Sequence, residues 1–180
     1  WRDESKAGRQ PDARVVNTSS GAGLLGSVGQ GNYAAAKAGI AEMTIQAAAE
    51  MGRYGITVNA IAPAARTRMT EVTFADDMAA PEGGFDAMAP ENVSPLVVWL
   101  GSTESAGVTG RVFEVEGGKV SVAQGWRHGP QRDKGARWAP SELGEVVRGL
   151  LDEAALADLT VNSLDDLERV LTDADFSQPR

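Results

Sequence analysis

The sequence predicts an α/β protein built on a parallel β-sheet. Two runs that contain several β-branched residues, 13–20 and 56–62, flank a long helical stretch at 32–51. A strand, a helix and a second strand in this order form a βαβ unit, whose two strands lie parallel. The chain has 180 residues, of which 42% are hydrophobic and 23% charged, so it can bury one core.

Each element of this unit begins and ends at recognisable residues. Residues 1–12 are typical of a helix end followed by a polar loop. The first strand leaves the sheet at Ser19-Ser20, and Pro63 stops the second strand, because proline cannot donate to a β-ladder. The helix is rich in good helix formers and free of proline. Its predicted sheet-facing stripe consists of Ile40, Met43, Ala47 and Met51.

Beyond this unit, the sequence predicts a loop, a helix and a third strand. The loop at 64–90 scatters Pro, Gly and Met among acidic residues, and loops of this length are usually functional or disordered. We expect the helix at 91–100 and the strand at 110–116, where Gly117-Gly118 ends it.

The composition changes after residue 123. Residues 124–139 form a basic and aromatic segment in an acidic protein, and two helices are expected beyond Pro140, at 141–156 and 163–171. We therefore divide the chain into a domain at 1–123 and an extension at 124–180.

The segment Gly21–Gly26 reads GAGLLG and fits the G-x-G-x-x-G pattern of a dinucleotide-binding turn. A strand precedes it, but residues 24–31 hold three more glycines and no helical period, so the helix begins only near Asn32. An acidic residue about 20 positions beyond the glycines should end a second strand, yet Glu42 lies inside the helix. We interpret GAGLLG as a flexible loop that does not hold a pyrophosphate.

Charge and composition argue against several functions. A net charge of -8 disfavours a nucleic-acid surface, and no run of 18 apolar residues is present to span a membrane. Without cysteine there is no disulfide or thiolate metal site, and a cytoplasmic location is compatible with this; we expect no metal. Because the chain opens on Trp1, we expect it to begin partway through a longer protein.

Ser20, Tyr33 and Lys37 are the candidate catalytic residues. Tyr33 and Lys37 lie four positions apart on one helix face. The pKa of a free tyrosine is near 10, and a nearby ammonium group lowers it by favouring the phenolate. Tyr33 can then exchange protons at neutral pH while Ser20 orients a substrate oxygen, which predicts chemistry at a carbonyl or an alcohol. A Tyr-Lys pair also occurs by chance on many helices, but the surrounding pattern favours catalysis.

Three segments resemble the second half of a short-chain dehydrogenase/reductase. They are Asn17–Ser20, Tyr33–Gly39 and Ile56–Pro63, and the resemblance covers about residues 1–122. It implies a Rossmann-like, doubly wound parallel sheet of the α/β class, of which only the second half is present, with a helical C-terminal extension.

The resemblance implies a role for each site residue. Tyr33 is the catalytic acid/base, Ser20 the substrate-orienting hydroxyl, and Lys37 both the neighbouring cation and a ligand of the nicotinamide ribose of NAD or NADP. The loop over the nicotinamide corresponds to Pro63, Ala64 and Thr67. The family's usual Pro-Gly is Pro-Ala here, and the threonine lies one residue closer to the proline than is common.

Residues 29–33, 62–70 and 124–126 carry a closer similarity. They resemble the (3R)-hydroxyacyl-CoA dehydrogenase part of the peroxisomal multifunctional enzyme and related actinobacterial reductases. This implies an acyl-CoA-like or steroid-like small-molecule substrate, and the family implies a homo-oligomer. The basic residues of the extension could meet CoA phosphates or a neighbouring subunit, or form a solvated surface; they are Arg127, Arg132, Lys134 and Arg137. We expect His128 at the surface, and Trp126 and Trp138 as packing anchors.

Several parts of the family's pattern have no counterpart in this sequence. They are the phosphate-binding turn, the residue that selects NAD or NADP, and the asparagine of the proton relay. We therefore expect these 180 residues alone to be inactive, and to fold poorly or be completed by other chains. GAGLLG then lies beside the substrate. Two functions remain: half of an oxidoreductase for a 3-hydroxyacyl thioester or similar alcohol, favoured by the intact site residues, or a non-catalytic interaction or assembly module.

Overall fold

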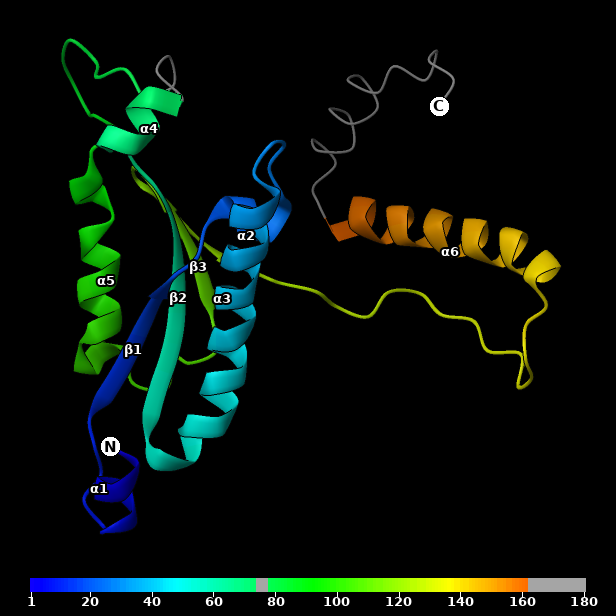
Figure 1. Cartoon of the computed structure of the whole chain (residues 1–180), viewed down its shortest axis with the longest axis horizontal. Helices are drawn as coiled ribbons and strands as arrows, with labels where there is room; N and C mark the ends of the chain where they lie inside the picture. Colours follow the sequence, from blue (N-terminus) through cyan, green and yellow to red (C-terminus); the bar gives the residue numbers. More distant parts are fainter. Residues whose placement is uncertain (74–77, 162–180) are drawn as a thin grey trace. The chain divides into compact units, whose positions relative to one another are not determined.

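A computed structural model describes residues 1–73 and 78–161 of the chain (Figure 1). The chain divides into two compact units, Trp1–Gly125 and Trp126–Arg180. Because their mutual placement is not determined, each unit is described by itself. Among the described residues, no helix has both the length and the apolar character needed to cross a membrane.

The first unit contains one four-stranded sheet in the order β1-β2-β3-β4. The strands are β1 (Ala13–Thr18), β2 (Ile56–Ala64), β3 (Val112–Glu116) and β4 (Lys119–Ala123). The first three strands are mutually parallel, which confirms the predicted α/β sheet. Strand β4 was not predicted; it turns back at Gly117-Gly118 and pairs antiparallel with β3.

Helices cover both faces of this sheet, which confirms the doubly wound arrangement (Figure 1). One face is covered by α3 (Gly31–Met51) and the other by α5 (Ser94–Gly101). Successive side chains of a strand point to opposite faces, so Ala60 packs under α3 while its neighbour Ile61 packs against Leu100 of α5. Ala60 and Leu100 are completely buried.

The predicted sheet-facing stripe of α3 is wrong at Met43 and Met51, whereas Ala47 packs against the core as predicted. The buried residues of this helix are Ala41, Thr44 and Ala48, whereas Met43 is 54% exposed and Met51 38%. Small side chains allow the helix to pack closely on the sheet, so the large side chains lie on its other face. Thr44 also donates its hydroxyl to the Ile40 carbonyl (2.8 Å) and accepts a bond from the Asn17 amide of β1 (3.0 Å).

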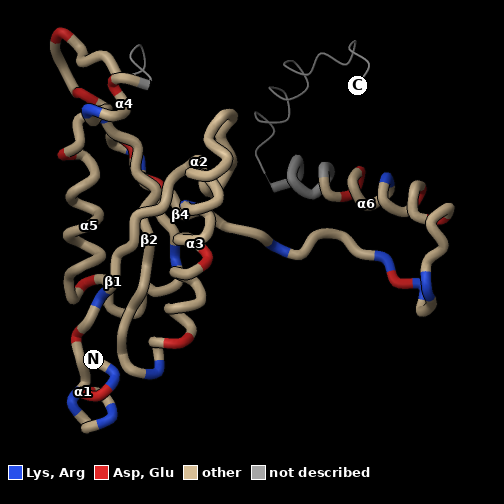
Figure 2. The backbone as a smooth tube through the Cα atoms, viewed as in Figure 1, with Lys and Arg blue, Asp and Glu red and all other residues tan. Residues whose placement is uncertain are grey.

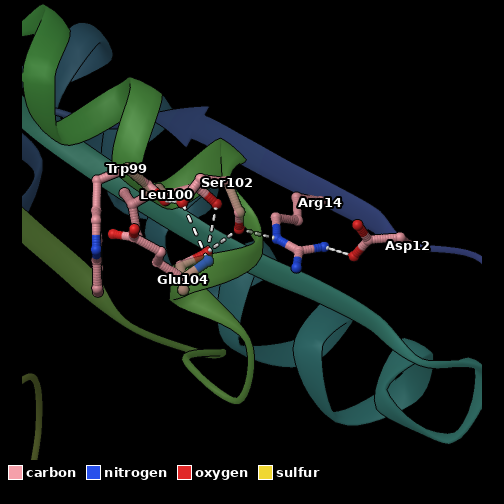
Figure 3. A network of polar contacts seen from close by, with 7 residues as sticks. Asp12, Arg14, Trp99, Leu100, Ser102 and Glu104 are labelled. Atoms are coloured by element: carbon pink, nitrogen blue, oxygen red, sulfur yellow. Dashed lines mark hydrogen bonds and ion pairs between the residues drawn. The ribbon is translucent and has the colours of Figure 1, made fainter.

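The C-terminal end of α5 is bonded to the first strand. Arg14 of β1 donates Nε–H to the Ser102 carbonyl and forms an ion pair with Asp12 (Figure 3). The Ser105 hydroxyl, which is fully buried, donates to the Leu100 carbonyl at 2.8 Å. Carbonyls at a helix end have no partner within the helix, and a cation near them is favourable. The bond from Arg14 therefore joins the end of α5 to β1, and the Ser105 bond closes the turn that follows α5.

Strand β2 continues through Pro63 to Ala64, so the prediction that Pro63 stops it is wrong. The carbonyl of Ile61 accepts a bond from Ser19 on the β1 side of the strand. Backbone groups two residues apart point the same way, so the nitrogen of Pro63 also faces that side. Strand β1 ends at Thr18, opposite Ile61, and no ladder bond is required from Pro63.

The GAGLLG segment is a short helix, α2 (Gly21–Leu25), so its interpretation as a flexible loop is wrong. Ser20 is its N-cap, and the Ser20 Oγ accepts a bond from the Ala22 amide at 3.3 Å. A Cβ added at Gly23 would lie 2.6 Å from the backbone of Lys37 and of Ala38 in α3. The glycine is therefore needed where two helices approach closely.

The remaining elements of this unit are short. They are α1 (Arg2–Lys6), the 3-10 turns Gly52–Tyr54, Pro90–Asn92 and Thr103–Ser105, and α4 (Arg68–Thr73). Helix α4 lies in the segment predicted to be irregular, and Thr67 precedes its first turn. The predicted helix at 91–100 is confirmed, as a 3-10 turn followed by α5.

The second unit consists of an extended segment, 126–139, and the helix α6 (Pro140–Val161), which confirms the helix predicted at 141–156. The extended segment carries basic residues and α6 carries acidic ones (Figure 2). Two ion pairs join them: Arg132 with Glu153, and Lys134 with Glu142 at 2.6 Å. Within this unit Trp126 is fully exposed, so its predicted role as a packing anchor stays a prediction. The helix predicted at 163–171 lies outside the described residues.

Replacing Gly23 by alanine is expected to destabilise the protein by about 1–3 kcal/mol, because the new methyl group overlaps the α3 backbone. Gly21→Ala in the same helix is the matched control, because a Cβ there meets nothing within 4 Å. Urea unfolding midpoints measure both effects. Equal midpoints for the two variants would contradict the close approach of α2 and α3.

The Glu142 side chain is expected to titrate below its ordinary pKa of about 4.3. The hydrogen bond from Lys134 lowers the pKa most, and the bond from the Ala139 amide adds to this. Because the pKa of Glu142 is lower in the folded state, this contact stabilises α6 at pH values above the unfolded-state pKa. The stabilisation is lost as the pH falls through the folded-state pKa. Carboxyl chemical shifts should move to a higher midpoint in Lys134→Met; an unchanged midpoint would contradict the bond.

Candidate active site at the carboxyl edge of the sheet

The predicted site residues gather at the carboxyl edge of the parallel strands. Ser20 follows the end of β1, and Pro63 and Ala64 form the end of β2. Because α3 leads from the carboxyl end of β1 to the amino end of β2, its first turns also lie at this edge. Those turns carry Tyr33 and Lys37. Ligands of open α/β sheets bind at this edge.

Lys37 connects the helix to the strand. Its Nζ donates to the Thr18 carbonyl at 2.9 Å, and the same atom lies 5.7 Å from the centroid of the Tyr33 ring. An ammonium group at this distance is attracted to an aromatic ring. An ammonium has three N–H donors, and the bond to Thr18 uses one of them. Lys37 is therefore held beside Tyr33 and keeps donors for a ligand.

Tyr33 and Ser20 are not joined to each other. The Tyr33 side chain is 45% exposed, and its backbone amide donates to the Asn32 side chain at 2.9 Å. The Ser20 hydroxyl accepts from Ala22 as the cap of α2. Within the described residues, no hydrogen bond links the Ser20 and Tyr33 hydroxyls. The structure therefore brings Lys37 to Tyr33, and leaves the Ser20 hydroxyl proton and the Tyr33 hydroxyl for a bound molecule.

Sequence reasoning missed Ser19, which holds this edge together. Its side chain is 2% exposed, its Oγ donates to the Lys37 carbonyl at 2.8 Å, and its amide donates to the Ile61 carbonyl at 2.7 Å. The alternation of side-chain direction along an extended chain could have identified Ser19, because two successive serines face opposite sides. Ser19 faces α3, whereas Ser20 begins α2.

Thr67 forms hydrogen bonds with a residue of the helix that follows it. Its amide donates to the Thr70 Oγ1 at 2.7 Å, and its own Oγ1 accepts from the Thr70 amide at 3.2 Å. This reciprocal pair caps the first turn of α4. Thr67 is exposed, and its predicted contact with a nicotinamide carboxamide stays a prediction.

An apolar pocket of about 420 Å³ lies beside the end of β2. Its lining joins the strand end to the first turns of α5 and comprises Pro63, Ala65, Pro90, Val93, Ser94, Val97 and Val98. Pro63 is the predicted cofactor residue that this pocket contains. Such a lining suits an apolar or aromatic group of a ligand.

The loop between β2 and α5 is anchored by an ion pair of Arg66 and Asp86. The hydrogen bond from Arg66 is the main cause that holds the pKa of Asp86 below its ordinary value, and the backbone amide of Met88 lowers it further. Among the described residues, no group of acidic or histidine side chains could hold a metal ion.

A protein-family model described as "Enoyl-(Acyl carrier protein) reductase" matches residues 4–119 of the chain. Among curated proteins, hydroxyacyl-CoA dehydrogenase ChsB1 of Mycobacterium tuberculosis is 44% identical over 152 residues, which cover 82% of this chain and 48% of that protein. A peroxisomal hydratase-dehydrogenase-epimerase of Neurospora crassa is 44% identical over 113 residues, which cover 63% of this chain and 12% of that protein.

Among solved structures, a short-chain dehydrogenase from Mycobacterium avium shares 68% sequence identity with a TM-score of 0.74. The match covers 86% of this chain and 49% of that protein. The chain thus spans about half the length of the two mycobacterial proteins that it matches.

Replacing Ser19 by alanine is expected to lower the free energy of unfolding by about 1 kcal/mol, because a buried hydrogen bond to α3 is lost. Ser27→Ala is the control, since Ser27 lies in an exposed turn between α2 and α3. Thermal unfolding of both variants measures the difference. A Ser19→Ala protein as stable as the control would show that the bond does not hold the edge together.

Proposed function

Because the chain belongs to the short-chain dehydrogenase/reductase family, we propose that it carries the catalytic and substrate-binding part of an NAD(P)-dependent oxidoreductase. The reaction interconverts a 3-hydroxyacyl thioester, with CoA as the expected carrier, or a similar secondary alcohol, and the corresponding ketone. The observation that carries this proposal is Lys37, held 5.7 Å from the Tyr33 ring by its bond to Thr18.

Tyr33 is proposed as the acid/base. In the oxidation direction, its phenolate takes the proton from the substrate hydroxyl, and in the reduction direction its hydroxyl returns that proton to the carbonyl oxygen. The ammonium of Lys37 stabilises the negative charge on Tyr33. The Ser20 hydroxyl donates a hydrogen bond to the same substrate oxygen. Its role as the cap of α2 uses a lone pair, so the hydroxyl proton is available.

The residues present fit a nicotinamide cofactor. The two further donors of Lys37 match the hydroxyl groups of a ribose, and Pro63 adds an apolar surface at the end of β2. Ala64 and Thr67 complete the proposed binding segment. When bound, NAD or NADP accepts or supplies the hydride. Gly23 lies at the contact where α2 packs on α3, so GAGLLG is not proposed as a pyrophosphate site.

The names of similar proteins support an acyl substrate. ChsB1 is a hydroxyacyl-CoA dehydrogenase, and a 39% identical relative from Vibrio harveyi is a 3-oxoacyl-[acyl-carrier-protein] reductase. We therefore propose acyl-CoA-like or steroid-like substrates. Ion pairs with α6 engage Arg132 and Lys134, which favours a structural role for them over CoA binding.

We also propose a homo-oligomer. Its support is the exposed apolar surface of α3, where Met43, Ile45 and Met51 are each between 38% and 54% exposed. A cytoplasmic location stays a prediction.

Tyr33→Phe is expected to lower kcat by about 10²–10⁴-fold in the protein expressed from its complete gene, because the acid/base group is lost. The assay follows NADH absorbance with a 3-hydroxyacyl-CoA. The chain contains one other tyrosine, Tyr54, which packs beside the core at the amino end of β2, so Tyr54→Phe is the matched control. An undiminished rate for Tyr33→Phe would remove the proposed mechanism.

A further inference from the structure

Arg66 joins the two ends of the loop between β2 and α5. One Nη donates to the Met78 carbonyl at 3.1 Å, the other forms the ion pair with Asp86, and the Arg66 amide donates to the Met88 carbonyl at 2.7 Å. The first residues of the loop are thereby bonded to its last ones. Only Ala65 separates Arg66 from the last residue of β2, so its own position is set by the sheet.

Asp86 is fixed on its other side by the backbone around it. Its second oxygen accepts from the Met88 amide at 3.1 Å, and the Asn92 amide group donates to the Asp86 carbonyl at 2.8 Å. Ala87 lies against the β3–β4 turn, where a Cβ on Gly117 would come within 3.1 Å of the Ala87 Cβ. The base of the loop is thus attached to two parts of the sheet.

The ion pair is largely shielded from solvent. The Arg66 side chain is 17% exposed and that of Asp86 27%. Partly buried pairs are screened less by salt than exposed ones, and arginine with a carboxylate forms directional hydrogen bonds. This pair therefore differs from the pair that Glu4 of α1 forms with Arg9, whose side chains are more than half exposed.

Apolar side chains flank the anchored base. Met69 and Val72 of α4 are 82% and 86% exposed, and Phe85, next to Asp86, is 67% exposed. Solvent-exposed apolar groups of this size beside a candidate active site suit contact with an apolar substrate. Their positions depend on the base of the loop, because α4 begins two residues after Arg66 and Phe85 directly precedes Asp86.

We propose that Arg66 and Asp86 are positioning residues, which hold α4 and Phe85 where they bind the acyl chain of the substrate. This inference rests on the proposed function for its substrate class. Neither residue touches the reacting atoms, so the pair acts on substrate binding and leaves the proton and hydride steps to other groups. The effect should therefore grow with the length of the acyl chain.

Asp86→Asn and Arg66→Gln are expected to raise KM for 3-hydroxydecanoyl-CoA about tenfold, because a charged hydrogen bond is lost, with kcat nearly unchanged. With 3-hydroxybutyryl-CoA, whose chain is too short to use the apolar side chains, KM should change less than twofold. The double variant Arg66→Asp/Asp86→Arg, in which the two charges are exchanged, should bring KM for 3-hydroxydecanoyl-CoA part of the way back to the original value. An equal KM change for both substrates, or no recovery where the exchanged protein is folded, would overturn the proposal.

Limited trypsin digestion tests the anchoring without an activity assay. Cleavage after Arg68 should be about tenfold faster in Asp86→Asn, followed by mass spectrometry of the fragment ending there. Glu4→Gln, which breaks the exposed Glu4–Arg9 pair, is the control and should leave this cleavage unchanged. Unchanged cleavage in Asp86→Asn would overturn the anchoring. Faster cleavage in a protein that oxidises no hydroxyacyl-CoA would support the anchoring while removing the proposed function.

Discussion

The structure depends on the way β1, β2 and α3 are joined at the carboxyl edge of the sheet. Ser19 bonds the Ile61 carbonyl with its amide and the Lys37 carbonyl with its hydroxyl, and Lys37 bonds the Thr18 carbonyl with its ammonium group. Ser19 is buried, so its amide and its hydroxyl would otherwise face the cost of burial without a partner. The same bonds that complete the fold therefore determine where Lys37 and Tyr33 lie.

Close packing supports this junction from both sides. The residues of α3 that face the sheet are small, and Gly23 lets α2 lie against the same helix. A larger side chain at Ala41 or Gly23 would move α3 relative to β1, and the Lys37 ammonium would move with it. Protein interiors are packed too densely to absorb such a change without a shift. The position of the candidate catalytic residues is thus a consequence of core packing.

The loop beyond β2 has a different relation to the sheet. Its base is fixed by Arg66, Asp86 and Asn92, while Met69 and Val72 of α4 are largely exposed. Binding groups are often found on loops that a rigid scaffold positions. Here the shielded ion pair of Arg66 and Asp86 fixes the base of the loop to the sheet. A sheet edge that positions the proposed proton-transfer groups and a loop with exposed apolar side chains agree with the proposed substrate, which has one polar reacting end and one apolar end.

Local patterns in the sequence were sufficient for the βαβ unit and for the helices at 91–100 and 141–156, because hydrophobic period and residue spacing are local properties. The catalytic roles of Ser20, Tyr33 and Lys37 stay a prediction. The sheet-facing side of α3 was assigned wrongly at Met43 and Met51, because the size of a side chain at a helix–sheet contact matters more than its hydrophobicity, and the size that fits depends on the distance between the elements. Pro63 was wrongly predicted to end β2. Whether the sheet needs an N–H group at this position depends on where the neighbouring strand β1 ends, which the local sequence does not show. Tertiary structure also decided that GAGLLG is a helix against α3, that β4 turns back on β3, and that Arg66 meets Asp86 across 20 residues, since each depends on groups that only folding brings together.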